Sequence, residues 1–180
     1  MSFAGREILI AVTGGIAAYK AAALVSRLVG SGAGVSVMMT ASATELVGPK
    51  TFQALTGRPV RLNLWNDESA IPHIAAAKRA ELLCVVPATA NILAKAALGI
   101  ADDLVSTTIL AFAGPVLFAP AMNSVMWNKP ATKRNIERLR DDGAFFIGPE
   151  TGRLCCGDDG AGRMAEPDAI LAEIERLLAN

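Results

Sequence analysis

An unusual stretch of the sequence lies near its C-terminus, where four glycines, two arginines and two adjacent cysteines fall within residues 152–164. Glycine lets the backbone fold closely over a ligand, and an arginine side chain can pair with an anionic group. The stretch has neither helical nor strand periodicity, so we expect a loop that closes over a ligand. A surface hairpin is the alternative, but it leaves the two cysteines among glycines unexplained.

A second candidate is the segment Thr13-Gly14-Gly15-Ile16-Ala17, which separates an apolar run from an alanine-rich segment. A tight turn from a strand into a helix presents backbone N–H groups and the positive end of the helix dipole, both of which stabilise an anion. The segment matches neither the dinucleotide-binding nor the triphosphate-binding glycine fingerprint. An ordinary strand-to-helix turn is therefore an equally open interpretation.

Two side chains offer acid–base or carboxylate-binding chemistry. His73 is the only histidine, and imidazole titrates near neutral pH, so it could accept a proton or stabilise charge. A lone histidine is more often a surface or satisfied core residue. Asn123, in Pro120-Ala121-Met122-Asn123, carries an amide that can hold a carboxylate without adding charge. The alternative is a strand-ending turn in which Asn123 caps a helix.

These candidates must be positioned by elements that alternate along the chain. Short apolar runs alternate with helical segments, which predicts a parallel α/β sheet with helices on both faces. In such a sheet, ligands bind beyond the carboxyl ends of the strands, so the loops after four strands predict one site for an extended ligand. The predicted strands are Glu7–Val12, Val35–Met39, Leu82–Val86, Val116–Ala119 and Ala144–Ile147; the predicted helices are Ile16–Val29, Asn91–Leu98, Asp103–Ala111, Ala131–Asp142 and Pro167–Leu178; residues 49–71 stay ambiguous, with a short strand at Val60–Leu62.

The composition excludes several classes of protein. The 180 residues include 17 Lys and Arg against 17 Asp and Glu, which argues against a nucleic-acid binder. With 52% hydrophobic residues but no apolar run near the ~18 residues of a membrane span, a buried oligomer interface is favoured. Three cysteines, of which Cys155 and Cys156 are adjacent, suit neither a disulfide framework nor a metal site. We therefore expect one reduced, cytoplasmic domain over residues 1–180, with no signal peptide and no metal.

Together these segments resemble the flavin-containing cysteine decarboxylase family over nearly the whole chain. The combination of the Pro-Ala-Met-Asn block with the Cys-Gly…Gly-Arg-Met loop is specific, whereas either alone is only suggestive. The resemblance is carried by Gly14–Lys20, the segment around His73, Pro87–Asn91, Asp102–Thr107, Pro120–Asn123 and Cys156–Met164.

The resemblance implies a three-layer Rossmann-like or flavodoxin-like fold. It also implies FMN, bound at a subunit interface of a homotrimer that can assemble into a dodecamer. Ser106 and Thr107 would contact the FMN of a neighbouring subunit, and Thr40 would lie near the phosphate end. The implied cofactor-binding residues are Gly14, Gly15, Ile16, Ala17, Thr40, Pro87, Ala88, Thr89, Asn91, Ser106 and Thr107; the implied substrate-binding residues are Ala121, Met122, Asn123, Gly162, Arg163 and Met164.

The implied reaction is FMN-dependent decarboxylation of 4′-phospho-N-pantothenoylcysteine (4′-phosphopantothenoylcysteine) to 4′-phosphopantetheine in coenzyme A biosynthesis. It would proceed by transient oxidation of the thiol, loss of CO₂ and re-reduction. His73 and Asn123 would be catalytic, and Cys156 would donate the final proton. Cys155 stands where the family often has alanine, so we expect it to be dispensable.

Three other functions remain open: a peptidyl-cysteine decarboxylase, a flavin prenyltransferase and a non-catalytic, flavin-binding regulatory subunit. Many bacterial members of the family continue into a ligase domain that joins cysteine to phosphopantothenate. The sequence ends at Asn180, so we expect either an enzyme with one activity or part of a bifunctional protein.

Overall fold

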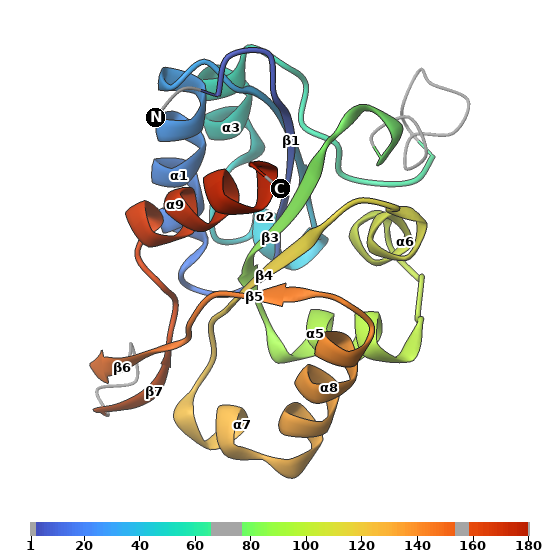
Figure 1. Ribbon diagram of the computed structural model, residues 1–180, viewed down its shortest axis with the longest axis vertical. Helices are drawn as coiled ribbons and strands as arrows, with labels where there is room; N and C mark the ends of the chain where they lie inside the picture. The colour runs from blue at the N-terminus through green and yellow to red at the C-terminus, as the bar shows by residue number, and fades with distance from the viewer. Residues whose placement is uncertain (1–2, 66–76, 154–158, 180) are drawn as a thin grey trace.

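The computed structural model describes residues 3–65, 77–153 and 159–179. Its centre is a parallel sheet of five strands in the order β2-β1-β3-β4-β5 (Figure 1). This is the flavodoxin-like order, which confirms the predicted fold class. The strands are β1 (Glu7–Val12), β2 (Gly34–Met39), β3 (Leu82–Ala88), β4 (Val116–Pro120) and β5 (Phe145–Phe146).

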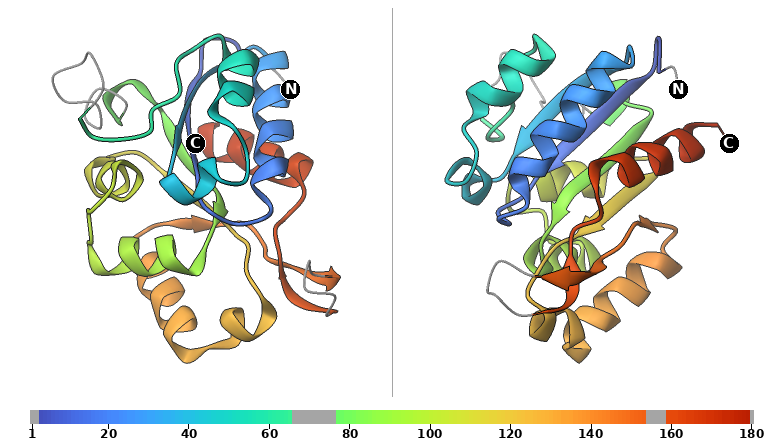
Figure 2. Two further views of the ribbon diagram at one scale, coloured as in Figure 1. Left: turned by 180° about the vertical axis from the view of Figure 1, so that it is seen from behind. Right: turned by 90° about the vertical axis from the view of Figure 1, so that its left-hand side faces the viewer.

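The central strands are buried on both faces, which is why they read as continuous apolar runs. Successive side chains of a strand point to opposite faces, so Ile8 and Ile10 enter one helical layer while Leu9 and Ala11 enter the other. Helices cover both faces of the sheet (Figure 2). One layer contains α1 (Ala18–Gly30), α3 (Pro49–Thr56) and α9 (Pro167–Leu178); the other contains α5 (Ala90–Leu98), α6 (Leu104–Ala111) and α8 (Pro130–Asp141).

The helix boundaries follow local capping chemistry. Thr89 begins α5, since its hydroxyl accepts a hydrogen bond from the N–H of Ile92. Asp103 begins α6 through a capping box in which the side chains of Asp103 and Ser106 each bind the other residue's backbone N–H. The predicted short strand at Val60–Leu62 is only an isolated bridge between Arg61 and Met38. Two short helices follow strands β2 and β4: α2 (Ala41–Thr44) and α7 (Ser124–Asn128).

The glycine-rich C-terminal stretch does not lack regular structure, contrary to our prediction. An antiparallel pair forms from β6 (Glu150–Arg153) and β7 (Asp159–Arg163). Small residues allow β7 to lie close to α7, because a Cβ added to Gly160 would come 2.9 Å from the Cβ of Ser124. Such a close backbone approach depends on tertiary contacts. It therefore leaves no alternating strand pattern in the sequence.

The described helices include none that is long and apolar enough to cross a membrane.

Candidate functional site

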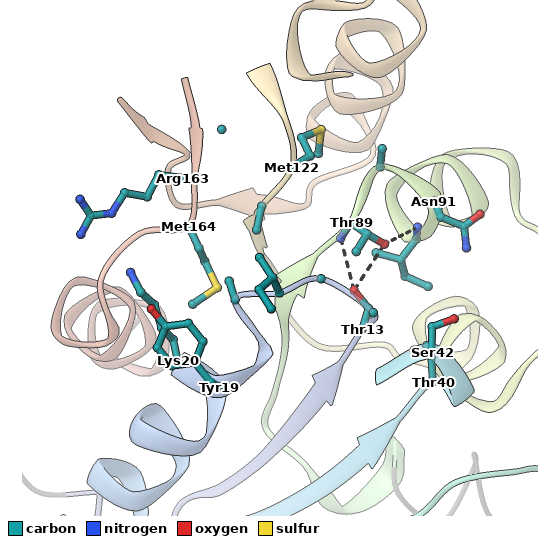
Figure 3. A pocket seen from close by; sticks show the side chains of 18 of the residues that line it. Thr13, Tyr19, Lys20, Thr40, Ser42, Thr89, Asn91, Met122, Arg163 and Met164 are labelled. Carbon is teal, nitrogen blue, oxygen red and sulfur yellow. Dashed lines mark hydrogen bonds between the residues drawn. The ribbon is translucent and has the colours of Figure 1, made fainter. Parts of the chain in front are cut away.

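A cavity of about 1160 Å³ lies beyond the carboxyl ends of β1, β2, β3 and β4. It is at the point where the strand order reverses between β1 and β3, the usual ligand site of an open α/β sheet. Figure 3 shows Thr40, Ser42 and Asn91 on one side of the cavity and Tyr19, Lys20 and Met164 on the other. The cavity therefore extends from the loops after β2 and β3 to α1 and the segment after the last strand.

The turn after β1 requires a glycine at Gly14 and leaves little room for a side chain at Gly15. A Cβ added to Gly14 would come 2.4 Å from the Cβ of Ser42, and one added to Gly15 would come 3.3 Å from the Cγ of Pro87. Both glycines line the cavity. Their lack of side chains brings the backbone against neighbouring loops and leaves room for a ligand above it.

Thr13 joins the turn after β1 to the loop after β3. Its buried hydroxyl donates a hydrogen bond to the carbonyl of Pro87 at 2.6 Å and accepts one from the N–H of Thr89 at 3.3 Å. Figure 3 shows Thr13 and Thr89 facing one another in the cavity wall. The two loops are thus held as one rigid surface.

The N-terminus of α1 lines this surface without a side-chain cap. The N-cap residue is Ala17, which makes no side-chain hydrogen bond to the helix. The N–H groups of Ala18 and Lys20 donate to the carbonyls of Gly15 and Ala17, so this helix end attracts an anionic ligand mainly through the positive end of its dipole. Beside it, the side chain of Ile16 is 57% exposed and lines the cavity. The arrangement can hold a molecule that has both an anionic group and an apolar surface.

Asn123 lines the cavity and also begins α7. Its Oδ1 accepts a hydrogen bond from the N–H of Val125 at 2.8 Å. The helix cap that the sequence left open as an alternative is therefore present. This cap fixes the amide group of Asn123 beyond the end of β4, in the lining of the cavity.

The end of β7 and the residue that follows it form one wall of the cavity. The N–H of Met122 donates a hydrogen bond to the carbonyl of Gly162 at 3.0 Å, which joins the hairpin to the loop after β4. Gly162, Arg163 and Met164 line the cavity. The segments around Asn123 and around Gly162 thus contact the same ligand space.

The structure brings most of the predicted site residues into one cavity. Those that line it are Gly14, Gly15, Ile16, Ala17, Thr40, Thr89, Asn91, Ala121, Met122, Asn123, Gly162, Arg163 and Met164. His73, Cys155 and Cys156 lie outside the described residues.

Four predicted cofactor residues do not line this cavity. Pro87 and Ala88 are the last residues of β3, and both are buried behind the turn at Gly15. Ser106 is buried in the cap of α6, where its N–H donates to Asp103 at 2.8 Å. The hydroxyl of Thr107 bonds to the carbonyl of Ala101. Within one chain, Ser106 and Thr107 therefore shape α6 rather than the cavity.

Several cavity residues were missed by the sequence analysis. Tyr19, Lys20, Ala23 and Arg27 line the cavity from α1; their helical spacing directly after the glycine turn was the available signal. Lys95 and Asp103 line it from α5 and the start of α6. The Nζ of Lys95 donates hydrogen bonds to Asp102 at 2.6 Å and to Asp103 at 2.8 Å, which raises the pKa of Lys95, so Lys95 stays charged.

Cys84, the cysteine that the structure describes, is not a reactive group of this site. Its side chain is buried in β3 within the hydrophobic core. Burial raises the pKa of its thiol far above the usual range, which removes the reactive thiolate. Any cysteine chemistry would have to come from Cys155 or Cys156.

Comparison with known proteins gives the family. The family model described as Flavoprotein matches residues 2–179. The chain belongs to this flavoprotein family. This flavoprotein is 50% identical, over 176 residues, to the coenzyme A biosynthesis bifunctional protein CoaBC of Bacillus subtilis (strain 168). The match covers 97% of the chain but only 43% of that relative, so the chain spans less than half the length of the protein it matches.

Two solved structures share the fold of this flavoprotein. A PPC decarboxylase mutant complexed with pantothenoylaminoethenethiol has a TM-score of 0.87 and 31% identity, covering 97% of this chain and 99% of that one. The FMN-dependent cysteine decarboxylase SpaF has a TM-score of 0.84 and 34% identity, covering 98% of this chain and 99% of that one.

Proposed function

We propose that this flavoprotein binds FMN and decarboxylates 4′-phosphopantothenoylcysteine to 4′-phosphopantetheine. The observation that carries the proposal is the convergence of the glycine turn, Asn123 and the Gly162–Met164 wall on one cavity, in a chain that is 50% identical to CoaBC. The likeness to a PPC decarboxylase complex over 97% of the chain supports the same substrate class.

The cavity fits FMN in three respects. A Cβ would clash at Gly14 and be tightly packed at Gly15, so the turn lies close to its neighbours, and the N-terminus of α1, which has no side-chain cap, suits an anionic group. The exposed side chain of Ile16 offers an apolar surface for a flat ring system. FMN occupies the corresponding position between β1 and β3 in flavodoxin-like folds. When bound, FMN would supply reversible hydride transfer with the cysteinyl group of the substrate.

Side chains of the cavity would bind the substrate and orient its cysteinyl group for this hydride transfer. The amide of Asn123 would hold the substrate carboxylate as a neutral hydrogen-bond donor, while its Oδ1 remains in the α7 cap. The β7 wall would cover the substrate and exclude water. We propose that His73 is a catalytic residue beside Asn123, and that Cys156 donates the final proton.

The assembly forms a further part of the proposal. Ile16, Tyr19 and Met126 line the cavity and remain exposed in a single chain. A neighbouring subunit of a homotrimer would cover them, and would offer Ser106 and Thr107 to this chain's flavin. A second activity, that of a ligase, in the same polypeptide is consistent with the bifunctional relative. Assembly into dodecamers and a cytoplasmic location stay predictions.

The deciding experiment is mass spectrometry of the product after anaerobic incubation of FMN-loaded protein with 4′-phosphopantothenoylcysteine. We expect 4′-phosphopantetheine, with loss of CO₂ and no added reductant. Accumulation of the ene-thiol would keep the flavin-dependent decarboxylation but contradict the role of Cys156. Unchanged substrate with bound flavin would contradict the proposed function.

A matched control substrate distinguishes this reaction from that of a peptidyl-cysteine decarboxylase. A short peptide that ends in cysteine carries the same reacting group without the phosphopantothenoyl arm. We expect turnover of the phosphopantothenoyl substrate and little of the peptide. The reverse preference would instead indicate a peptidyl-cysteine decarboxylase.

A further inference from the structure

One carboxylate, Glu166, links the hairpin wall of the cavity to the first helix. Its Oε1 accepts a hydrogen bond from the Nζ of Lys20 at 2.8 Å and another from the Nη2 of Arg163. Lys20 lies in the first turn of α1, and Arg163 ends β7. Lys20, Arg163 and Glu166 all line the cavity, and Figure 3 shows Lys20 and Arg163 on the same side of it.

Glu166 is placed where a helix cap would be, yet it does not cap the helix. It is the N-cap residue of α9, but its side chain makes no hydrogen bond to the helix. Serine, threonine, aspartate and asparagine are the usual residues at this position. The longer glutamate side chain instead reaches Lys20, whose own side chain is only 13% exposed. The Lys20–Glu166 ion pair is therefore shielded from water on the lysine side, while the Glu166 side chain is 43% exposed.

Removing the negative charge would turn an attraction into a repulsion. Lys20 and Arg163 bind the same oxygen atom, so without the carboxylate two cations would face one another. Residues 162–166 are held by the hydrogen bond between Gly162 and Met122, by the buried side chains of Met164 and Ala165, and by the ion pair of Glu166 with Lys20. Loss of the ion pair would loosen the end of β7 at Arg163, which shares the carboxylate.

We propose that Glu166 is a positioning residue, which holds the β7 wall against α1 and thereby sets the affinity of the site for its substrate. This inference rests on the proposed decarboxylase function only for the identity of that substrate. The position of the wall itself can be measured without any turnover.

The test compares Glu166→Gln with Glu173→Gln, both on α9. Glu173 pairs with Arg176 on the same helix and does not line the cavity, so it is a matched control. Both variants should fold, because Ile170 and Ile174 anchor α9 in the core and Asp168 pairs with Arg27 of α1. Circular dichroism and thermal unfolding would verify this.

Hydrogen exchange of the whole 180-residue chain decides the positioning. We expect the Glu166→Gln variant to exchange faster than wild type in peptides covering residues 120–124 and 159–165, where the Met122–Gly162 hydrogen bond lies. Glu173→Gln should leave both peptides unchanged. Equal protection in wild type and Glu166→Gln would overturn the proposal.

Steady-state kinetics with 4′-phosphopantothenoylcysteine measures the consequence. We expect kcat/KM to fall about tenfold in Glu166→Gln, since misplacement of a site from a distance can cost up to about 100-fold. Most of the loss should lie in KM, because the wall binds substrate rather than reacts with it. A fall confined to kcat would contradict the positioning role. Faster exchange in a protein that shows no turnover in any variant would instead contradict the proposed function while supporting the position of the wall.

Discussion

The backbone of Gly162 lies against the backbone of Met122 more closely than any other residue type would allow. The N–H of Met122 donates to the carbonyl of Gly162 at 3.0 Å, and a Cβ on Gly162 would lie 2.2 Å from the oxygen of Met122. Gly162 also has a φ of +144°, a conformation that other residues rarely adopt. The contact joins the hairpin to the loop that carries Asn123, so both sides of the substrate space depend on it.

Gly162→Ala should therefore separate the hairpin from the loop after β4. We expect the free energy of unfolding to fall by about 1–3 kcal/mol, the usual cost of forcing extra atoms into packed structure. The rate of decarboxylation of 4′-phosphopantothenoylcysteine should fall by more than the loss of folded protein explains. Denaturant unfolding and turnover would be measured together. Gly30→Ala is the control, since nothing lies within 4 Å of a Cβ there; equal losses in the two variants would contradict this account.

Asn123→Asp should abolish turnover while the protein stays as stable as wild type. Aspartate caps helices as well as asparagine does, so the bond from the N–H of Val125 can be kept. A carboxylate would, however, repel the substrate carboxylate that the amide is proposed to hold. The measurements are thermal unfolding and product formation. Undiminished turnover would show that Asn123 does not bind the carboxylate, and Asn123→Ala should lose stability as well.

Thr13→Val should loosen the junction between the loops after β1 and β3. Valine has the same shape but leaves the carbonyl of Pro87 and the N–H of Thr89 without the Thr13 hydroxyl. Unpaired buried polar groups cost about 1–3 kcal/mol each, and we expect weaker FMN binding, measured by fluorescence titration. Thr44→Val removes one exposed hydroxyl bond and should change neither property. A Thr13→Val variant with wild-type stability would contradict the argument.

Glu7 should contribute stability that disappears in acid. The hydrogen bond from Arg58, at 2.6 Å, lowers the pKa of Glu7 against the opposing effect of burial, and Arg79 lowers it further. Because the folded pKa lies below the unfolded value, Glu7 stabilises the fold above the unfolded pKa. That contribution is lost as the pH falls through the folded pKa.

The test for Glu7 is denaturant unfolding of wild type and Glu7→Gln across pH. We expect the variant to be less stable at pH 7 and the difference to shrink below about pH 4.5, the ordinary value for this side chain. A difference that stays constant down to the acid limit would contradict the sign of the shift.

The sheet and its loops could be predicted because their signals are local. Each central strand is an apolar run, since both faces of a parallel sheet are buried, and β1 was predicted with the bounds that the structure has. The loops after β1, β2, β3 and β4 meet because parallel strands end at the same edge. This rule predicts where the site lies, whereas the individual cofactor and substrate residues were implied by the family resemblance.

Other placements depend on packing that a linear pattern does not contain. Pro87 and Ala88 do not line the cavity of the single chain, because β3 extends through Ala88 and buries both. Ser106 caps α6 within the chain, and its contact with the flavin of a neighbouring subunit stays a prediction. The β6–β7 hairpin has no alternating pattern, because glycines serve its contacts with α7 and with Met122 rather than its pairing.

The sequence by itself determined the order of elements, the glycine turn at Gly14 and Gly15, and the grouping of polar loops at one sheet edge. Only the tertiary structure decided which partners those groups meet. Lys20 and Glu166 are 146 positions apart, yet they share a hydrogen bond. Apolar periodicity and capping act over a few residues, whereas such a contact depends on how α1, β7 and α9 pack around the sheet.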